Sequence, residues 1–293
     1  MERLIEALVG FYVPLGLGFL YKRKWGYSEE LAKGLSRTIL YFFFPMLIFN
    51  AISRKRFTTI MGDITPIFLS SIIATIVSLT AAIVLFRGDR EMWLPSFYLN
   101  AVYLPTPIAY ALWGPESIYV IGFYVIVNVT TGNVLAPILL GNQSIKKGVK
   151  RLAKYPPIYA VLAGLIVSFL ELQLPPLVLN LTEKLGSIAP PLALYVLGYE
   201  PINTVKIDKD SGRIAVIRFL ASPFFASLIL PSLTSNQLVL KVLLLESTMP
   251  PAVANVVLAN EFSQNPTRIS QTVLKTTLIS TILLPLYLII FGF

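Results

Sequence analysis

An apolar segment, residues 92–113, is interrupted near its middle by residues that break a helix. Pro105 and Pro107 each lack a backbone N–H and clash with the preceding turn, so a helix does not run through them unbroken. Thr106 is predicted to be an N-cap, with Pro107 opening a new helix. Asn100, just before the break, carries an amide that needs hydrogen-bond partners in an apolar setting. Because about 20 residues cross a bilayer, this break would expose polar backbone groups deep in a membrane.

A second apolar segment, residues 237–260, has the same kind of interruption at Pro250 and Pro251. The polar side chains beside these prolines are Ser247, Thr248 and Asn255. Each new helix start would offer unpaired N–H groups and a partial charge of about +0.5. At about 1.5 Å per residue, both breaks fall near the middle of the membrane. If they cross, the two helix starts favour a bound anion such as a carboxylate. The alternative is that the prolines only kink two packed helices.

The spacing of the prolines indicates two copies of one unit. Pro105 and Pro250 are 145 positions apart, and Pro45 and Pro190 have the same separation. The chain divides into ten apolar spans, five in each copy, and an odd number makes the repeat inverted. The predicted spans are residues 4–21, 31–53, 64–86, 92–113, 117–140, 156–171, 176–200, 213–231, 237–260 and 268–292. The predicted parts are a first repeat (1–140), a cytoplasmic connecting loop (141–155) and a second repeat (156–293).

The composition is that of a multi-pass membrane protein. Hydrophobic residues make up 55% of the chain and charged residues 13%, and the mean hydropathy is +0.73. The chain has no cysteine and no histidine, which excludes disulfides, thiol nucleophiles and histidine-based metal sites. We therefore expect no metal, no cofactor and no enzymatic activity.

The distribution of basic residues predicts the orientation in the cell membrane. Sixteen lysines and arginines fall on one predicted side and four on the other, and the richer side is cytoplasmic. Both termini are therefore predicted to lie outside. The net charge of +9 reflects this asymmetry and attraction to lipid headgroups, so no nucleic-acid partner is expected.

Several of these segments resemble the auxin efflux carrier family, within the superfamily of bile acid/sodium symporters. Residues 100–107 look like that family's N-x-x-x-x-G-x-P element, with Pro105 where the family usually has glycine. The most specific match is residues 249–262, which are similar to the second crossover of the family. Further similar segments are residues 41–49, 113–116 and 190–198.

The resemblance implies a fold and a mechanism. The fold is all-α, with ten transmembrane helices in a 5+5 inverted repeat and with broken helices 4 and 9 crossing. Helices 1, 2, 6 and 7 would form a scaffold that dimerises, and helices 3–5 and 8–10 a transport domain. This domain would carry a small organic anion past the scaffold in an elevator-type movement.

The predicted substrate-binding residues are Asn100, Pro105, Thr106, Pro107, Asn128, Ser247, Thr248, Pro250, Pro251 and Asn255. For Asn100 and Asn255, the alternative role is to satisfy backbone groups freed by the breaks, and for Asn128 it is helix packing.

Two charged residues inside spans are candidates for coupling. Glu246 lies roughly 14 Å deep and one turn before Pro250. It would either carry a coupling proton or pair with Lys275, which lies about 10 Å inside its own span. A purely structural ion pair is the alternative. Arg218 is expected to extend its charged end to the membrane interface.

Three functions remain open at this point. The first is a secondary carrier or facilitator for an organic anion, and the second is a sodium-coupled symporter of the bile-acid type. The third is a membrane enzyme or a receptor that uses Lys275 as a Schiff base.

Overall fold

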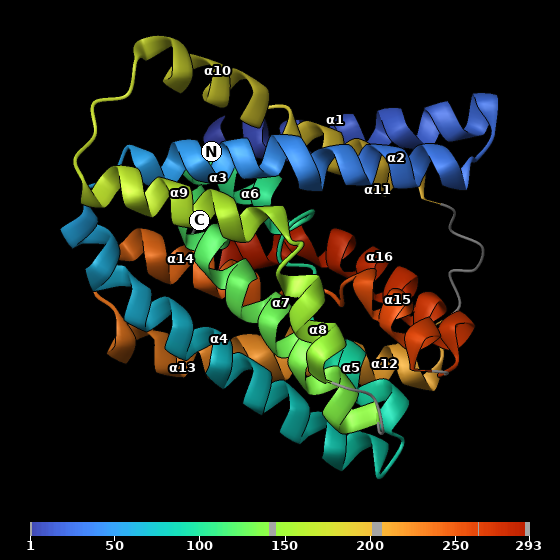
Figure 1. The fold of residues 1–293 in the computed structure, drawn as a ribbon. Coiled ribbons are helices and arrows are strands. Elements are labelled where there is room, and N and C mark those ends of the chain that lie inside the picture. The colour runs from blue at the N-terminus through green and yellow to red at the C-terminus, as the bar shows by residue number, and fades with distance from the viewer. Residues whose placement is uncertain (1, 141–144, 201–206, 263, 291–293) are drawn as a thin grey trace. The chain divides into compact units, whose positions relative to one another are not determined.

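The computed structural model describes residues 2–140, 145–200, 207–262 and 264–290 (Figure 1). Within these ranges every regular element is a helix and there is no strand, which confirms the all-α prediction. The ten-helix 5+5 repeat stays a prediction.

The chain forms two compact units. Unit 1 comprises residues 1–65, 102–123 and 155–201, and unit 2 comprises residues 66–101, 124–154 and 202–293. Unit 1 contains α1 (Glu2–Trp25), α2 (Glu29–Thr38), the π-helical turn η1 (Ile39–Phe43), α3 (Phe44–Ser53), α6 (Pro105–Trp113), η3 (Pro115–Ser117), α9 (Pro156–Phe169), α10 (Pro176–Gly186) and α11 (Ala189–Tyr199).

Unit 2 contains the greater part of two long helices and a set of shorter ones. The two long helices are α4 (Phe57–Phe86) and α7 (Ile118–Leu140). The others are η2 (Arg90–Met92), α5 (Trp93–Phe97), α8 (Ile145–Leu152), α12 (Lys209–Val216), the π-helical turn η4 (Ile217–Ala221), α13 (Ser222–Leu233), α14 (Gln237–Ser247), α15 (Ala254–Glu261) and α16 (Pro266–Ile290). Within this unit α13 packs on α14, and α12 and α15 both pack on α16.

Four helical stretches in the described part of the chain are long and apolar enough to cross a membrane. They are Glu29–Ser53, Phe57–Phe86, Pro115–Leu140 and Lys209–Leu233. Several apolar helices thus support a multi-pass membrane protein.

Two details differ from the sequence-based expectation. The predicted span 176–200 is not continuous, because α10 ends at Gly186 and α11 begins at Ala189. Pro190 and Pro191 stand in the first turn of α11 and lack the N–H groups that would continue α10. The predicted connecting loop contains a helix, α8, among its described residues.

In unit 1, α1 and α11 pack closely because each presents a glycine to the other's backbone. A Cβ atom on Gly18 would lie 2.0 Å from the carbonyl oxygen of Tyr195. A Cβ atom on Gly198 would lie 1.9 Å from the carbonyl oxygen of Leu15. No side chain fits at such distances, so glycine permits this contact, as small residues do between membrane helices.

Gly18→Ala is therefore expected to destabilise the protein by about 3 kcal/mol, since the new methyl group collides with backbone atoms. Gly16→Ala is the matched control on the same helix, because a Cβ atom there meets nothing within 4 Å. The control should keep or raise stability, by up to about 1 kcal/mol from helix propensity. Thermal unfolding of both variants in detergent measures the difference, and equal effects would contradict the packing described.

Candidate functional site

In unit 2, two unwound segments of the chain cross as a short antiparallel pair. Leu99 forms a β-bridge with Pro251, and the backbone N–H of Asn100 donates to the carbonyl oxygen of Pro250 at 2.8 Å. The first segment follows α5, and the second joins α14 to α15. The second break lies at Pro250 and Pro251, as predicted, whereas the first unwound segment ends before Pro105, which opens α6. We call this meeting point of Leu99 and Asn100 with Pro250 and Pro251 the crossing.

Two buried asparagines hold the crossing from outside the paired segments. Asn128, on α7, accepts from the backbone N–H of Leu99 at 3.1 Å and donates to the Leu99 carbonyl oxygen at 2.9 Å. Asn255, on α15, donates to the carbonyl oxygens of Tyr98 at 2.9 Å and Ala252 at 2.8 Å. Both amides therefore bind backbone groups of the unwound segments. This is one of the two roles expected for Asn255, whereas the sequence predicts helix packing or a substrate path for Asn128.

Arg218 also binds the crossing, although its place in the sequence predicts that its charged end reaches the membrane interface. That expectation is wrong, because the side chain is fully buried at 0% exposure. Its Nε donates to the Met249 carbonyl oxygen and its Nη2 to the Ser247 carbonyl oxygen, both at 2.9 Å. Its Nη1 donates to the hydroxyls of Ser78 at 2.8 Å and Ser222 at 3.2 Å.

The prolines explain why an arginine is needed there. In a continuous helix the Ser247 carbonyl would accept from the N–H four residues later, but that residue is Pro251. Arg218 supplies the missing donor. The signal that could have revealed it is the Pro250-Pro251 pair, which leaves a buried carbonyl in need of a partner from elsewhere.

Glu246 lies on the last turn of α14, directly before Ser247. It is 0% exposed, and neither oxygen of its carboxyl group has a hydrogen-bond partner among the described residues. The predicted pairing of Glu246 with Lys275 is wrong, because Lys275 donates to Asp208 instead. The charged group that interacts electrostatically with Glu246 is Arg218.

The comparisons with known proteins agree with a membrane carrier. The model of the Mem_trans family, described as membrane transport protein, matches residues 3–146 and 142–288. The chain belongs to the Mem_trans family. This confirms the resemblance to the auxin efflux carrier family.

Two archaeal relatives match nearly end to end. One is an uncharacterized transporter of Methanocaldococcus jannaschii, 27% identical over 97% of this chain and 95% of the relative. The other is an uncharacterized transporter of Methanothermobacter thermautotrophicus, 25% identical over 97% of each chain.

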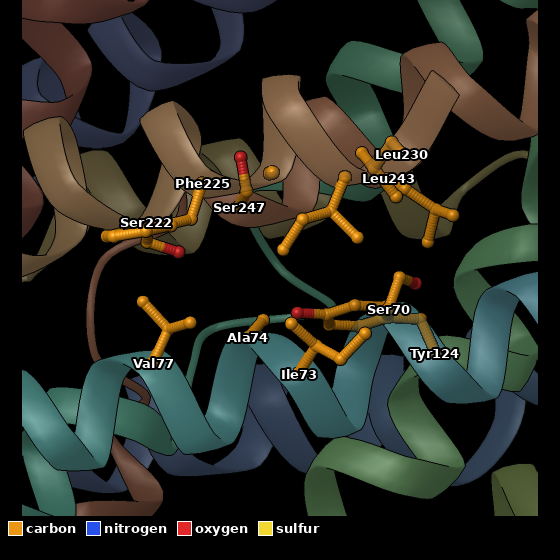
Figure 2. Close-up of a pocket in the computed structure, with 12 residues that line it drawn as sticks. Ser70, Ile73, Ala74, Val77, Tyr124, Ser222, Phe225, Leu230, Leu243 and Ser247 are labelled. Carbon is orange, nitrogen blue, oxygen red and sulfur yellow. The ribbon is translucent and has the colours of Figure 1, made fainter. Parts of the chain in front are cut away.

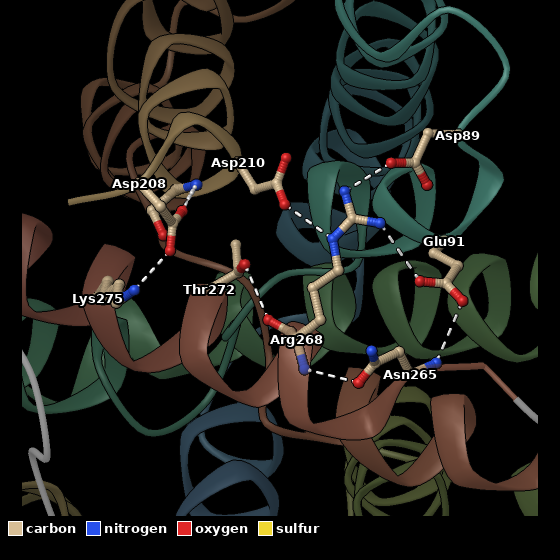
Figure 3. A network of polar contacts seen from close by, with 9 residues as sticks. Asp89, Glu91, Asp208, Asp210, Asn265, Arg268, Thr272 and Lys275 are labelled. Atoms are coloured by element: carbon tan, nitrogen blue, oxygen red, sulfur yellow. Dashed lines mark hydrogen bonds and ion pairs between the residues drawn. The ribbon is translucent and has the colours of Figure 1, made fainter. Parts of the chain in front are cut away.

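In this Mem_trans chain, Lys275 belongs to a polar network at one end of unit 2 (Figure 3). Its partner Asp208 is the N-cap of α12 and accepts from the backbone N–H of Ser211 at 2.8 Å. Burial alone would raise the pKa of Asp208, but the hydrogen bonds from Lys275 and Ser211 outweigh it and lower the pKa to about 2. Lys275 is therefore bound in an ion pair rather than available to Glu246.

Arg268, at the start of α16, is the centre of the same network. Its guanidinium group binds Asp210 at 2.8 Å, Asp89 at 2.6 Å and Glu91 at 3.4 Å. Glu91 also accepts from the backbone N–H of Asn265 at 3.2 Å. One arginine thus ties the ends of α4, α12 and α16 together (Figure 3), and we interpret this network as structural.

A narrow, mainly apolar pocket lies between α4, α13 and α14 of unit 2 (Figure 2). The hydroxyl groups on its wall belong to Ser70, Tyr124, Ser222 and Ser247. Ser222 is bound to Arg218, so the pocket adjoins the arginine that holds the crossing.

The remaining predicted residues lie in two places. The hydroxyls of Ser247 and Thr248 donate to carbonyl oxygens of the preceding turn of α14. Pro105, Thr106 and Pro107 belong to α6 in unit 1.

The predicted N-cap at Thr106 is wrong. The helix begins at Pro105, so Leu104 is the N-cap and the helix starts earlier than expected. Within the part of the chain that the structure describes, the buried Thr106 hydroxyl has no hydrogen-bond partner.

Proposed function

We propose that this protein is a secondary membrane carrier for a small organic anion, which binds at the crossing in unit 2. The observation that carries the proposal is the crossing itself, where unwound backbone is held by side chains instead of by helix hydrogen bonds. Irregular backbone at membrane depth is tolerated where it lines a binding site, and broken helices of this kind form the substrate sites of secondary transporters.

Two sources of positive charge favour an anion. α15 begins at Ala254, immediately after the crossing, and its N-terminus carries a partial charge of about +0.5. Arg218 adds a full charge that is bound to the same backbone. A carboxylate is the substrate group that best matches the positive end of a helix beside a buried cation.

The division of the chain into two units supports an elevator-type movement, in which unit 2 carries the substrate and unit 1 is the scaffold. Dimerisation through the scaffold, outward-facing termini and coupling to sodium stay predictions. A sodium-coupled symporter of the bile-acid type is distinguished by uptake that requires sodium.

Uptake into proteoliposomes tests the proposal. The purified protein should accumulate at least one radiolabelled carboxylate from a panel that includes indole-3-acetate, benzoate and malonate. The corresponding uncharged amide should not compete for uptake. Transport of none of the panel, or equal competition by the amide, would contradict an anion site.

A further inference from the structure

Glu246 is the buried acidic group at the crossing that the proposed function leaves unused. Both of its carboxyl oxygens are buried and lack a hydrogen-bond partner among the described residues. An ionised carboxylate without hydrogen bonds is very costly in an apolar interior. The arrangement therefore fits a carboxyl group that carries a proton in the conformation described.

The carboxyl group of Glu246 is an alternative hydrogen-bond acceptor for Arg218. Its four hydrogen bonds all go to neutral acceptors, two carbonyls and two hydroxyls. An ionised carboxylate is a much stronger acceptor for a guanidinium group, especially in a bidentate pair. Since Glu246 already interacts electrostatically with Arg218, an ionised Glu246 would compete with the crossing for this arginine.

We propose that Glu246 is a proton-binding site, and that its protonation determines whether Arg218 binds the crossing or the carboxylate. With the proton bound, Arg218 donates to the carbonyl oxygens of Ser247 and Met249, as described here. When the proton leaves for water, the O–H bond of Glu246 breaks and Arg218 pairs with the carboxylate. The carbonyl oxygens of Ser247 and Met249 then lose their donor, and Arg218 no longer holds the crossing in place.

The charges give the sign of the coupling, which rests on the proposed function. With Glu246 protonated, the pair carries a net charge of one positive unit, and with Glu246 ionised it carries none. An anion at the crossing therefore binds best to the protonated form, and by reciprocity the anion promotes proton binding. Proton and anion should thus bind together, as in a symporter.

In the part of the chain that is described, two tyrosines are the further titratable groups that interact with Glu246 or Arg218. Tyr124, on α7, interacts electrostatically with both Glu246 and Arg218, and Tyr287, on α16, interacts with Arg218. Lys275 is bound to Asp208. Within the described helices, Glu246 is therefore the acidic group that interacts with Arg218.

Infrared spectroscopy of the full-length protein in lipid tests the proton site without any substrate. At neutral pH the wild type should show the carbonyl stretching band of a protonated carboxylic acid. Glu246→Gln should lose this band, whereas Glu30→Gln, which removes an exposed carboxylate, should keep it. The band should decrease as the pH is raised, because the carboxyl group then loses its proton. A band that persists in Glu246→Gln, or no such band at all, would overturn the proposal.

A second measurement tests the switch and separates it from the proposed function. The apparent affinity for a stabilising carboxylate should fall by up to tenfold per pH unit above the titration of Glu246, the limit of about one linked proton. In Glu246→Gln it should not depend on pH. An equal pH dependence in both proteins would refute the switch. If no carboxylate stabilises either protein, the proposed function fails, while the infrared band still decides the proton site.

Discussion

Replacing Arg218 with methionine is expected to lower the free energy of unfolding by about 3–5 kcal/mol. Methionine has a similar length but donates no hydrogen bond, so the carbonyl oxygens of Ser247 and Met249 would remain buried without a donor. Anion binding should be lost as well, because the crossing loses both its support and its positive charge. Thermal unfolding in detergent and proteoliposome uptake measure the two effects.

The matched control is Arg213→Met, one turn earlier on the adjoining helix α12. Arg213 is exposed and lies over the ring of Phe86, 5.5 Å from its centroid. Its loss should cost no more than about 1 kcal/mol and should leave anion binding in place. If both arginine variants unfold alike and still bind the anion, Arg218 does not hold the crossing.

The second large effect is expected for Asn128→Leu, which keeps the shape of the side chain and removes its amide. The N–H of Leu99 would then lose its partner, whereas the Leu99 carbonyl oxygen would lose the amide but keep the backbone N–H of Ala101 at 3.0 Å. One buried N–H left without a partner costs about 1–3 kcal/mol, and we expect a loss of that size. Thermal unfolding gives this value, and stabilisation by a carboxylate should disappear in the same variant.

Thr131→Val provides the comparison on the same helix. The Thr131 hydroxyl donates to carbonyl oxygens of its own helix, at Val127 and Asn128. These carbonyls keep their helix partners without it, so a change within about 0.5 kcal/mol is expected. Similar losses for the two variants would mean that Asn128 has no special role at the crossing.

The breaks themselves could be predicted from the sequence because proline acts locally. Pro250 and Pro251 lack N–H groups wherever they stand, so a helix must end at them. An amide beside such a break must also find a partner, and Asn255 does so at the crossing. The breaks could therefore be predicted, because each depends on a few residues that are close together in the chain.

The partners of the charged side chains could not be predicted in this way. Arg218 meets Ser247 and Met249, about 30 residues away in sequence, and such pairings depend on tertiary structure. Depth along a helix pointed to a pair between Lys275 and Glu246, but it says nothing of Asp208, which approaches from the N-terminus of α12. A cap residue alone also does not fix the first residue of a helix, and α6 starts at Pro105 rather than after Thr106.

The most direct test of the crossing as an anion site is the thermal stability of the purified protein with a panel of carboxylates and their uncharged amides. A ligand that binds only the folded state raises its stability, by about 2.7 kcal/mol at a concentration of 100 Kd. At least one carboxylate should stabilise the wild type in a concentration-dependent manner, its amide should not, and Asn128→Leu should abolish the effect. Stabilisation by acid and amide alike, or an unchanged response in Asn128→Leu, would contradict an anion site at the crossing.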